Sequence, residues 1–305
     1  MQESANSPTI IIHDALRRAV EKETDEHVTV LYDEKGYPSY MLVVPKFDVS
    51  AIDSSLGVGT HPAFIVDGKE KEQIFVGQFP AAVCDGYACS LPDAEIQRYI
   101  NFDDSREACA KKGKGWHLIT AWEWAAVAFW ITKNRSKYFK RTCWEWNDGL
   151  KLLDGRILFP NDNAFAMPEA DWPFQGACLD ADGDDPVLSA EVSHFSEEDP
   201  KGAEDDRDDD YTYIGDLKSL ETSDSYKALP AEARERMARI MIDPAPRSVL
   251  SDMSGGLYVR NYGERLPSRG GHWSYGANAG LAILDLDNRR SLVSNNLGLR
   301  PAFIL

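Results

Sequence analysis

A helix start at Thr120 is the sequence feature that most limits the fold of this chain. Thr120 and Glu123 have the spacing of a capping box, in which each side chain bonds the backbone N–H of the other residue. The apolar run after Glu123, WAAVAFW, predicts a helix behind this start, and DSREACAKKGKG predicts an earlier helix that ends in a glycine-containing turn. The segment from Asp104 to Trp130 is therefore expected to form two helices.

Alternating apolar runs predict strands on the N-terminal side of these helices. HVTVLY and YMLVVP predict two strands joined by the turn DEKGYPS, and AFIVDG with EQIFVGQF predicts a second hairpin. Residues 9–20 predict a short strand or turn that runs into an amphipathic helix. Strands together with two helices indicate an α+β fold. We expect a small N-terminal α/β appendage over residues 1–58 and the main domain over residues 59–305.

The charge of the chain argues against several classes of partner. A formal net charge of −17 and a pI near 4.8 disfavour DNA, RNA and anionic membranes, because affinity for phosphates comes mainly from Lys and Arg. No apolar run reaches the length of about 18 residues that a membrane-spanning helix needs. The start of the chain lacks the basic and apolar regions of a secretory signal, which predicts a protein that is cytoplasmic at synthesis.

The last 37 residues, from Arg269 to Leu305, contain no Lys, Glu, Gln or Met. These four types make up about a seventh of the chain, so about five or six of them would be expected in a window of this size. The stretch is nevertheless rich in polar and loop-forming residues. A restriction on residue type therefore acts on this segment.

Three sequence elements, in order along the chain, resemble a known family. GWHLITAWEWAAVA is similar to a segment of the formylglycine-generating-enzyme branch of the C-type lectin fold, and CWEWNDGLKLLDGRILFP is similar to an element of its retroelement-diversified members. YVRNYGERLPSRGG then leads into Trp273 and a closing NLGLR, which resemble the variable region of proteins diversified by a diversity-generating retroelement. The resemblance covers about residues 60–180 and 245–305. It implies an α+β C-type lectin fold of the formylglycine-generating-enzyme type.

The resemblance also implies a cause for the missing residue types. In that family a reverse transcriptase miscopies the adenines of a template repeat, so an Asn codon becomes any codon that ends in a pyrimidine. Such codons cannot encode Trp, Lys, Glu, Gln or Met. The one Trp of the segment, Trp273, lies in a framework position. The variable region would then span residues 269–305.

Residues between the framework positions of this region are expected to contact ligand. The framework consists of small, aromatic or apolar residues and two arginines: Arg269, Gly270, Gly271, Trp273, Gly276, Gly280, Leu286, Gly298 and Arg300. The expected ligand-contact residues, each reachable from an Asn codon by adenine changes alone, are His272, Ser274, Tyr275, Asn278, Asp285, Asp287, Leu292 and Ser294. Further candidates are Ala277, Leu281, Ala282 and Val293. The closing LGLRPAFIL is expected to form a core strand.

These features favour a non-enzymatic protein that binds a ligand or receptor through a diversified C-terminal surface. Loops carried on a packed fold are where binding residues usually lie. The expected partner is an unidentified protein or glycan on a cell surface, and the implied setting is a phage tail, a prophage or a bacterial genomic element. Display in several copies would suit a homo-oligomer. An undiversified structural protein of a phage or prophage, built on the same fold, is the alternative.

A formylglycine-generating-type oxidase is the enzymatic alternative. Those oxidases bind copper through two cysteines near and after the RGG element, whereas this chain has no cysteine after Cys178. The iron-dependent sulfoxide synthases of the same fold need a histidine cluster, and His272 is the only histidine among the last 100 residues. The Gly-x-Ser-x-Gly and HExxH patterns are absent as well. Neither catalytic residues nor a cofactor are therefore expected.

The stretch from residue 180 to 243 is expected to be an acidic insertion. DADGDD and SEEDPKGAEDDRDDD hold many carboxylates and few apolar residues, which favours a solvated loop. A calcium site is the alternative, because four carboxylates have the spacing of ligands in an EF-hand loop, although Asp185 stands where that loop needs glycine. The four candidate calcium ligands are Asp180, Asp182, Asp184 and Glu191.

The cysteines, tryptophans and isolated histidines have structural interpretations. Five cysteines without a CxxC pair do not support a zinc or redox motif, and the close pair Cys84 and Cys89 is expected to be reduced. His117 and His194 have no metal-ligand or nucleophile neighbours in the sequence and are expected to be structural or at the surface. Clustered tryptophans belong to a hydrophobic core more often than to a sugar-stacking platform. Core positions are therefore expected for Trp116, Trp122, Trp124, Trp130, Trp144 and Trp146.

Overall fold

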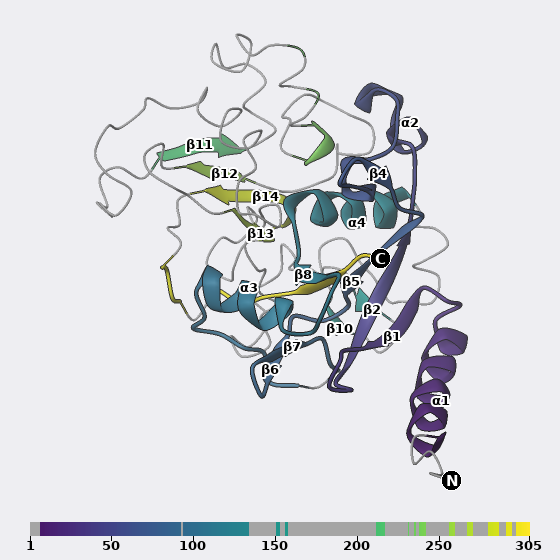
Figure 1. Ribbon diagram of the computed structural model, residues 1–305. Helices are drawn as coiled ribbons and strands as arrows, with labels where there is room; N and C mark the ends of the chain where they lie inside the picture. The colour runs from purple at the N-terminus through teal and green to yellow at the C-terminus, as the bar shows by residue number, and fades with distance from the viewer. Residues whose placement is uncertain are drawn as a thin grey trace.

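The computed structural model of the chain, drawn in Figure 1, describes residues 7–92, 94–133, 151–152, 156–157, 212–216, 231, 235, 238–241, 256–259, 267–270, 280–286, 291–294 and 297–305. The helices are α1 (Ser7–Glu23), α2 (Val49–Ile52), α3 (Phe102–Ala110) and α4 (Ala121–Lys133), with 3₁₀ turns at Ser54–Leu56 and Pro62–Phe64. The strands are β1 (Val28–Tyr32), β2 (Pro38–Pro45), β3 (Ile65–Val66), β4 (Lys69–Glu70), β5 (Gln73–Gly77), β6 (Ala82–Cys84), β7 (Tyr87–Cys89), β8 (Trp116–Leu118), β9 (Lys151–Leu152), β10 (Arg156–Ile157), β11 (Thr212–Asp216), β12 (Gly256–Val259), β13 (Ser268–Gly270), β14 (Gly280–Leu286) and β15 (Pro301–Phe303). This mixture of helices and sheets confirms the predicted α+β class.

A five-stranded antiparallel sheet in the order β1-β2-β5-β15-β8 brings the two ends of the chain together. The C-terminal strand β15 lies inside this sheet, where Ala302 pairs with Val76 on one side and with His117 on the other. Leu299, Arg300 and Ala302 are all buried. The closing segment is therefore a core strand, as its apolar sequence predicts.

The N-terminal segment differs from its prediction in two ways. Residues 9–12 belong to helix α1 and not to a strand or turn, because a run of three isoleucines is too short to distinguish helix from strand by its pattern. Arg17 on α1 donates to the backbone carbonyl of Val30 at 2.9 Å, so the helix covers the edge strand β1. The hairpin β1–β2 is continuous with the main sheet through the pairing of β2 with β5, so it does not stand apart as an appendage.

The second predicted hairpin is also formed differently. Asp67 and Gly68 both have positive φ, 50° and 70°, and make a two-residue turn between the short strands β3 and β4. The run EQIFVGQF provides β5, which pairs with β2 and β15 instead of with β3. A turn does therefore follow the first run, whereas the two strand partners of β5 come from other parts of the chain.

The helix start at Thr120 is confirmed in atomic detail. Thr120 donates its backbone N–H to Glu123 Oε2 at 2.9 Å, and the backbone N–H of Glu123 donates to Thr120 Oγ1 at 3.1 Å. Asn101 caps α3 by accepting from the backbone N–H of Asp104 at 2.9 Å. A short strand, β8, lies between the two helices in addition to the expected turn.

Helix α4 is the centre of the hydrophobic core. Trp124 and Trp130 on this helix are buried, as is Trp116 on β8, and Trp122 packs against the same core, which confirms the core interpretation for these four residues. Trp144 and Trp146 lie outside the described residues. No helix in the described part of the chain is long and apolar enough to cross a bilayer.

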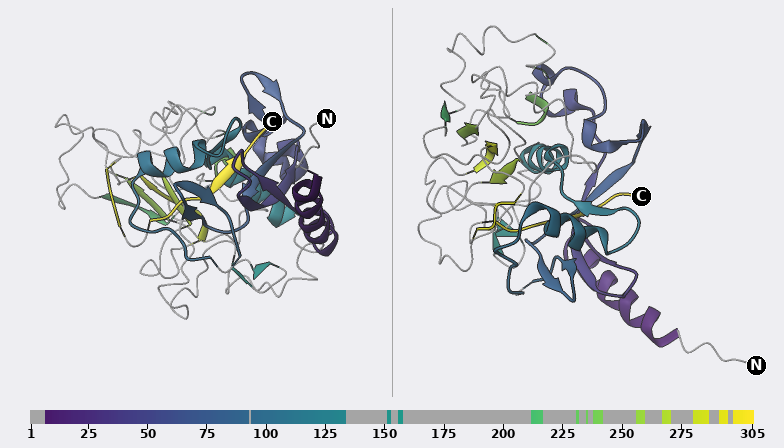
Figure 2. Two further views of the ribbon diagram at one scale, coloured as in Figure 1. Left: turned by 60° about the horizontal axis from the view of Figure 1, so that its bottom comes forward. Right: turned by 60° about the vertical axis from the view of Figure 1, so that its left-hand side comes forward.

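A second sheet, in the order β11-β12-β14-β13, contains β13 and β14, the first two strands described in the C-terminal segment. In Figure 1 and in the right-hand view of Figure 2, α4 lies between this sheet and strands β2 and β5. Leu284 on β14 is fully buried and belongs to the same hydrophobic cluster as the residues of α4. Strand β14 of the C-terminal segment is thus packed on the hydrophobic core that the N-terminal half of the chain forms.

Candidate functional site

The structure describes three of the eight residues expected to contact ligand. Asp285 lies in β14, where it is paired with Ser268 of β13 on one side and with Tyr258 of β12 on the other. Leu292 and Ser294 are half-buried in the segment that follows β14. The other five expected contacts lie outside the described residues, namely His272, Ser274, Tyr275, Asn278 and Asp287. The same holds for the candidate calcium ligands Asp180, Asp182, Asp184 and Glu191.

Arg269, the first framework residue of the segment, is fully buried. Its Nη2 donates to the backbone carbonyl of Ile240 at 2.9 Å. Ile240 is itself buried in the main hydrophobic cluster. A buried arginine therefore ties β13 to a backbone position in the segment 238–241.

Arg300, the last framework residue, is anchored in the same manner. Its side chain is 1 % exposed, and Nη1 donates to the backbone carbonyls of Gly77 at 2.6 Å and Gln78 at 2.9 Å. A Cβ at Gly77 would lie 3.1 Å from the carbonyl oxygen of Pro301, closer than an ordinary contact, so any side chain there would crowd β15. The close approach of β5 and β15 and the buried guanidinium together fix the end of the segment.

The segment before Arg300 also contacts the loop before α3 through backbone atoms. The backbone N–H of Tyr99 donates to the carbonyl oxygen of Ser294 at 3.0 Å. Val293 is 49 % exposed and Tyr99 is 64 % exposed, so this is a place where large apolar side chains face solvent. Sequence reasoning did not single out Tyr99, which has no distinctive neighbours in the chain.

A buried histidine positions the segment 238–241 that receives Arg269. His61 Nε2 donates to the backbone carbonyl of Arg239 at 2.9 Å, and its Nδ1 accepts from the backbone N–H of Ala63 at 3.3 Å. The ring is fully buried among aromatic side chains, including Trp122 and Phe129 at centroid distances of 6.0 and 5.9 Å. Burial lowers the pKa of His61 to about 4, so the ring is neutral near pH 7.

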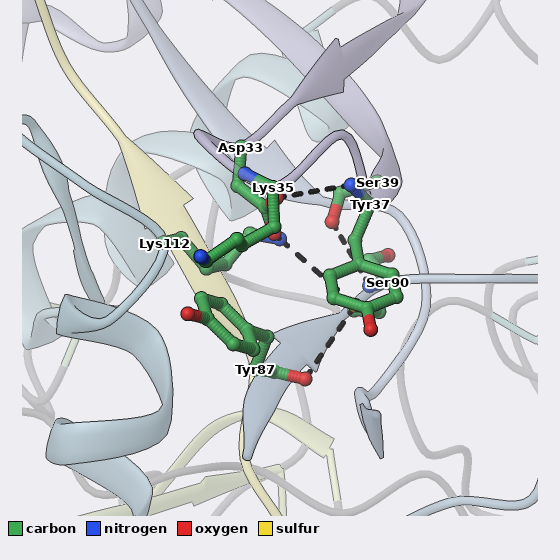
Figure 3. Close-up of polar contacts among 8 residues, drawn as sticks. Asp33, Lys35, Tyr37, Ser39, Tyr87, Ser90 and Lys112 are labelled. Atoms are coloured by element: carbon green, nitrogen blue, oxygen red, sulfur yellow. Dashed lines mark hydrogen bonds and ion pairs between the residues drawn. The ribbon is translucent and has the colours of Figure 1, made fainter. Parts of the chain in front are cut away.

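Two opposite charges are buried close to where β1 and α3 end. Asp33 and Lys112 form an ion pair of 2.8 Å in which neither side chain is exposed (Figure 3). Asp33 Oδ1 also accepts from the backbone N–H groups of Lys35 and Tyr37, at 3.0 and 2.9 Å. Lys112 Nζ lies 4.5 Å from the ring centroid of Trp116. The charges are satisfied inside the protein, and the sequence contains no local sign of this pairing.

The thiol of Cys89 lies beside this ion pair, 4.0 Å from Lys112 Nζ. Burial raises its pKa to about 12, although the charge of Lys112 acts in the opposite direction, and burial also raises the pKa of Cys109. Cys84, Cys89 and Cys109 are free thiols, as expected for a reduced chain. Cys89 and Cys109 are protonated near pH 7, so they are not poised as nucleophiles.

His117 is more closely connected than its sequence context indicates. Its Nε2 pairs with Glu123 Oε1 at 2.8 Å, and its Nδ1 lies 3.0 Å from the carbonyl oxygen of Gly115. Burial lowers the pKa of His117, but the charge of Glu123 and these two hydrogen bonds raise it above its ordinary value overall. Glu123 therefore caps α4 through one carboxylate oxygen and pairs with His117 of β8 through the other. His194 lies outside the described residues.

Within the described ranges, no three His, Cys, Asp or Glu side chains are grouped so as to hold a metal ion. No protein-family model matches the chain, and no curated protein matches its sequence. The described part of the candidate site therefore consists of two buried arginines of the C-terminal segment, Arg269 and Arg300, and of the exposed side chains of Tyr99 and Val293.

Proposed function

We propose that this chain is a non-enzymatic binding protein whose C-terminal segment, residues 269–305, presents a diversified ligand-contact surface on a C-type-lectin-type scaffold. The observation that carries the proposal is the absence of Lys, Glu, Gln and Met from this segment. Codons derived from Asn by adenine mutagenesis cannot encode those residues. A structural loop under ordinary selection has no reason to avoid all four long, flexible side chains.

The way in which the segment is anchored supports the proposal. Arg269 stands at its start and Arg300 near its end, and both donate to backbone carbonyl groups of the scaffold, those of Ile240, Gly77 and Gln78. A backbone carbonyl is present whatever side chain its residue carries. The anchors therefore do not depend on the identity of the residues between them, which is what a variable surface on a fixed scaffold requires.

The architecture is compatible with this scaffold. The predicted core consists of the N-terminal hairpin, two helices and the C-terminal strand, and the main sheet with α3 and α4 contains these parts. The C-type lectin topology itself, and the boundaries of the insertion over residues 180–243, remain part of the proposal. So does the domain assignment to residues 59–305.

The proposed partner is a protein or glycan on a cell surface, and the proposed setting is a phage tail or a bacterial surface. Tyr275, His272 and the two aspartates would supply a tyrosine ring, an imidazole and two carboxylates to the contact. Tyrosine offers a large apolar area and a hydroxyl group at low entropic cost, which suits a binding surface. Display in several copies would raise the avidity of a weak contact.

The proposal is tested by randomising the eight expected contact codons together as NNY, where the first two bases vary and the third is a pyrimidine. Clones are displayed on yeast and scored for protease resistance, which reports folding. Most clones should fold, because a diversified contact surface has to tolerate substitution at these positions. The matched control randomises the framework codons for Arg269, Trp273, Leu286 and Arg300 in the same way, and most of those clones should be unfolded. Equal loss of folded clones in the two libraries would contradict the proposal.

A further inference from the structure

We propose that Tyr99, which lies outside the variable segment, is a fixed anchor of the ligand surface and that the surface takes a protein partner. This inference rests on the proposed function and adds to it one contact residue and one class of ligand. It begins from exposure. Tyr99 is one of few large apolar side chains in the described ranges that face solvent, with 64 % of its surface exposed.

The position of Tyr99 joins it to the variable segment. Its backbone N–H donates to the Ser294 carbonyl oxygen at 3.0 Å, and Ser294 is one of the expected contact residues. Val293, which precedes Ser294 in the chain, is itself 49 % exposed. The bond uses only backbone atoms, so it persists whichever residue occupies position 294. Tyr99 therefore stays beside the variable segment in every diversified form of the protein.

The loop that carries Tyr99 is held on both sides. Before it, the backbone N–H of Gln97 donates to the carbonyl oxygen of Ala81 at 2.9 Å. After it, Asn101 caps helix α3, and Ile100 packs against the hydrophobic core. An aromatic ring on a backbone fixed in this way loses little conformational freedom on binding, which is the property of a preorganised contact residue.

The backbone conformation of Tyr99 also supports a role in binding. Its φ is 55°, in the left-handed region that is sterically unfavourable for a bulky side chain and that glycine adopts freely. Residues held in such conformations are concentrated at ligand-binding sites, where function offsets the strain. A loop selected only for stability would favour glycine here, whereas this loop places a tyrosine.

A protein is the class of partner that these side chains fit best. Tyr99 and Val293 offer an exposed aromatic and an exposed aliphatic group, and aliphatic side chains gain from contact with apolar protein surface but not from contact with the hydroxyl groups of a glycan. Tyrosine is also enriched among the residues that carry most of the energy of protein interfaces. Tyr99 would contribute to every complex, and the variable residues would choose the partner.

The test uses the full chain on yeast, with the eight contact codons randomised as NNY and ubiquitin, a small folded protein, as the probe. Several independent binders are isolated, and Tyr99→Ala, Tyr99→Phe and Val58→Ala are introduced into each. Val58 is a matched control because it is exposed and apolar but far from Tyr99 in the sequence. Tyr99→Ala should weaken the Kd about tenfold or more in most binders, while the other two variants change it by about threefold at most. A Kd within about twofold of the parent for Tyr99→Ala in most binders would overturn the inference.

Two further measurements test the proposal: Tyr99→Gly distinguishes a binding role from a structural one, and a parallel screen distinguishes a protein partner from a glycan. Tyr99→Gly should weaken binding without lowering the Tm, because glycine adopts the positive φ without strain. A lowered Tm with unchanged binding would show a purely structural residue and overturn the inference. Binders that arise only against an immobilised oligosaccharide, screened in parallel, would overturn the assignment of a protein partner. A library that yields folded clones but no binders to either probe would overturn the proposed function itself, and the role of Tyr99 with it.

Discussion

Arg269 and Ile240 are joined by a buried hydrogen bond of 2.9 Å, from the guanidinium Nη2 to the backbone carbonyl oxygen. Through it the first residue of the C-terminal segment is attached to a short piece of chain that His61 and Arg239 hold against the main body. Arg239 donates from Nε to the carbonyl oxygen of Leu56 at 3.1 Å, and its own carbonyl accepts from His61. The start of the C-terminal segment thus depends on residues more than a hundred positions away in sequence.

Arg269→Lys should destabilise the fold even though it keeps the positive charge. Lysine lacks the planar guanidinium and cannot reproduce its donors in the same buried space. We expect the free energy of unfolding, measured with urea, to fall by about 2 kcal/mol, as for loss of a buried hydrogen bond from a charged donor. Ser291→Ala, at an exposed position of the same segment, serves as the control and should leave the urea midpoint nearly unchanged. Equal midpoints for the two variants would contradict the anchoring role of Arg269.

The buried imidazole of His61 should make the stability fall in mild acid. Its pKa is lowered to about 4 in the folded protein, so the unfolded chain binds more protons between pH 6.5 and about 4. The contribution of His61 is therefore present above pH 6.5 and is lost as the pH falls through this window. Between pH 7 and pH 5 the loss amounts to roughly 2 kcal/mol.

His61→Gln isolates this effect, because all other titrating groups are common to the two proteins. His117, with its raised pKa, acts in the opposite sense: it stabilises below pH 6.5, and its contribution is lost as the pH rises through its folded pKa. Its contribution cancels in the comparison. Urea unfolding at pH 7 and pH 5 should show a steeper loss for the wild-type protein than for His61→Gln. Parallel losses would mean that His61 is not buried as a neutral ring.

The buried pair of Asp33 and Lys112 should be costly to break from one side. Lys112→Met leaves the Asp33 carboxylate buried without its ion partner, and we expect a loss of about 3–5 kcal/mol. The double variant Asp33→Asn with Lys112→Met should be more stable than Lys112→Met alone, because no unpaired charge is then buried. Lys111, the neighbouring residue, forms an exposed pair with Glu107 at 2.7 Å and gives the matched control. Lys111→Met should have little effect on the urea midpoint, and an effect as large as that of Lys112→Met would contradict the account.

Glu123→Gln should separate the two roles of Glu123. The amide oxygen can still accept from the backbone N–H of Thr120, so helix α4 should keep its cap, whereas the charge facing His117 is lost. The pKa of His117, followed by NMR titration, should therefore fall, since the charge of Glu123 is a cause of its elevation. Thr120→Ala should instead cost about 1 kcal/mol of stability through loss of the N-cap. An unchanged His117 titration in Glu123→Gln would show that the ion pair is not formed in solution.

Local patterns predicted the elements of this fold better than their partners. The capping box at Thr120, the hairpin β1–β2 and the burial of Trp116 and Trp124 follow from residue spacing and hydrophobicity within short windows. The pairing of β5 with β2 and β15 has no such signal, because strands of similar composition compete for the same partners until the whole sheet forms. For the same reason the continuity of the N-terminal hairpin with the main sheet could not be predicted from the sequence.

The parts of the candidate site that sequence could not supply are contacts between distant residues. Asp33 and Lys112 are 79 positions apart, and each looks like an ordinary charged residue in its own segment. Tyr99 meets Ser294 through backbone atoms, which leave no trace in residue type. The missing residue types of the C-terminal segment, in contrast, can be read directly from the sequence, because composition does not depend on a contact.

The most direct test of the central claim is the DNA sequence around the gene. A near-copy of the DNA that encodes residues 269–300 should lie nearby, next to a reverse transcriptase gene, and its mismatches with the gene should fall almost entirely at adenines of the copy. They should cluster at the codons of the expected contacts, which include His272, Ser274, Tyr275, Asp285, Asp287, Leu292 and Ser294. The absence of such a copy, or mismatches spread evenly over all four bases, would contradict a diversified binding surface.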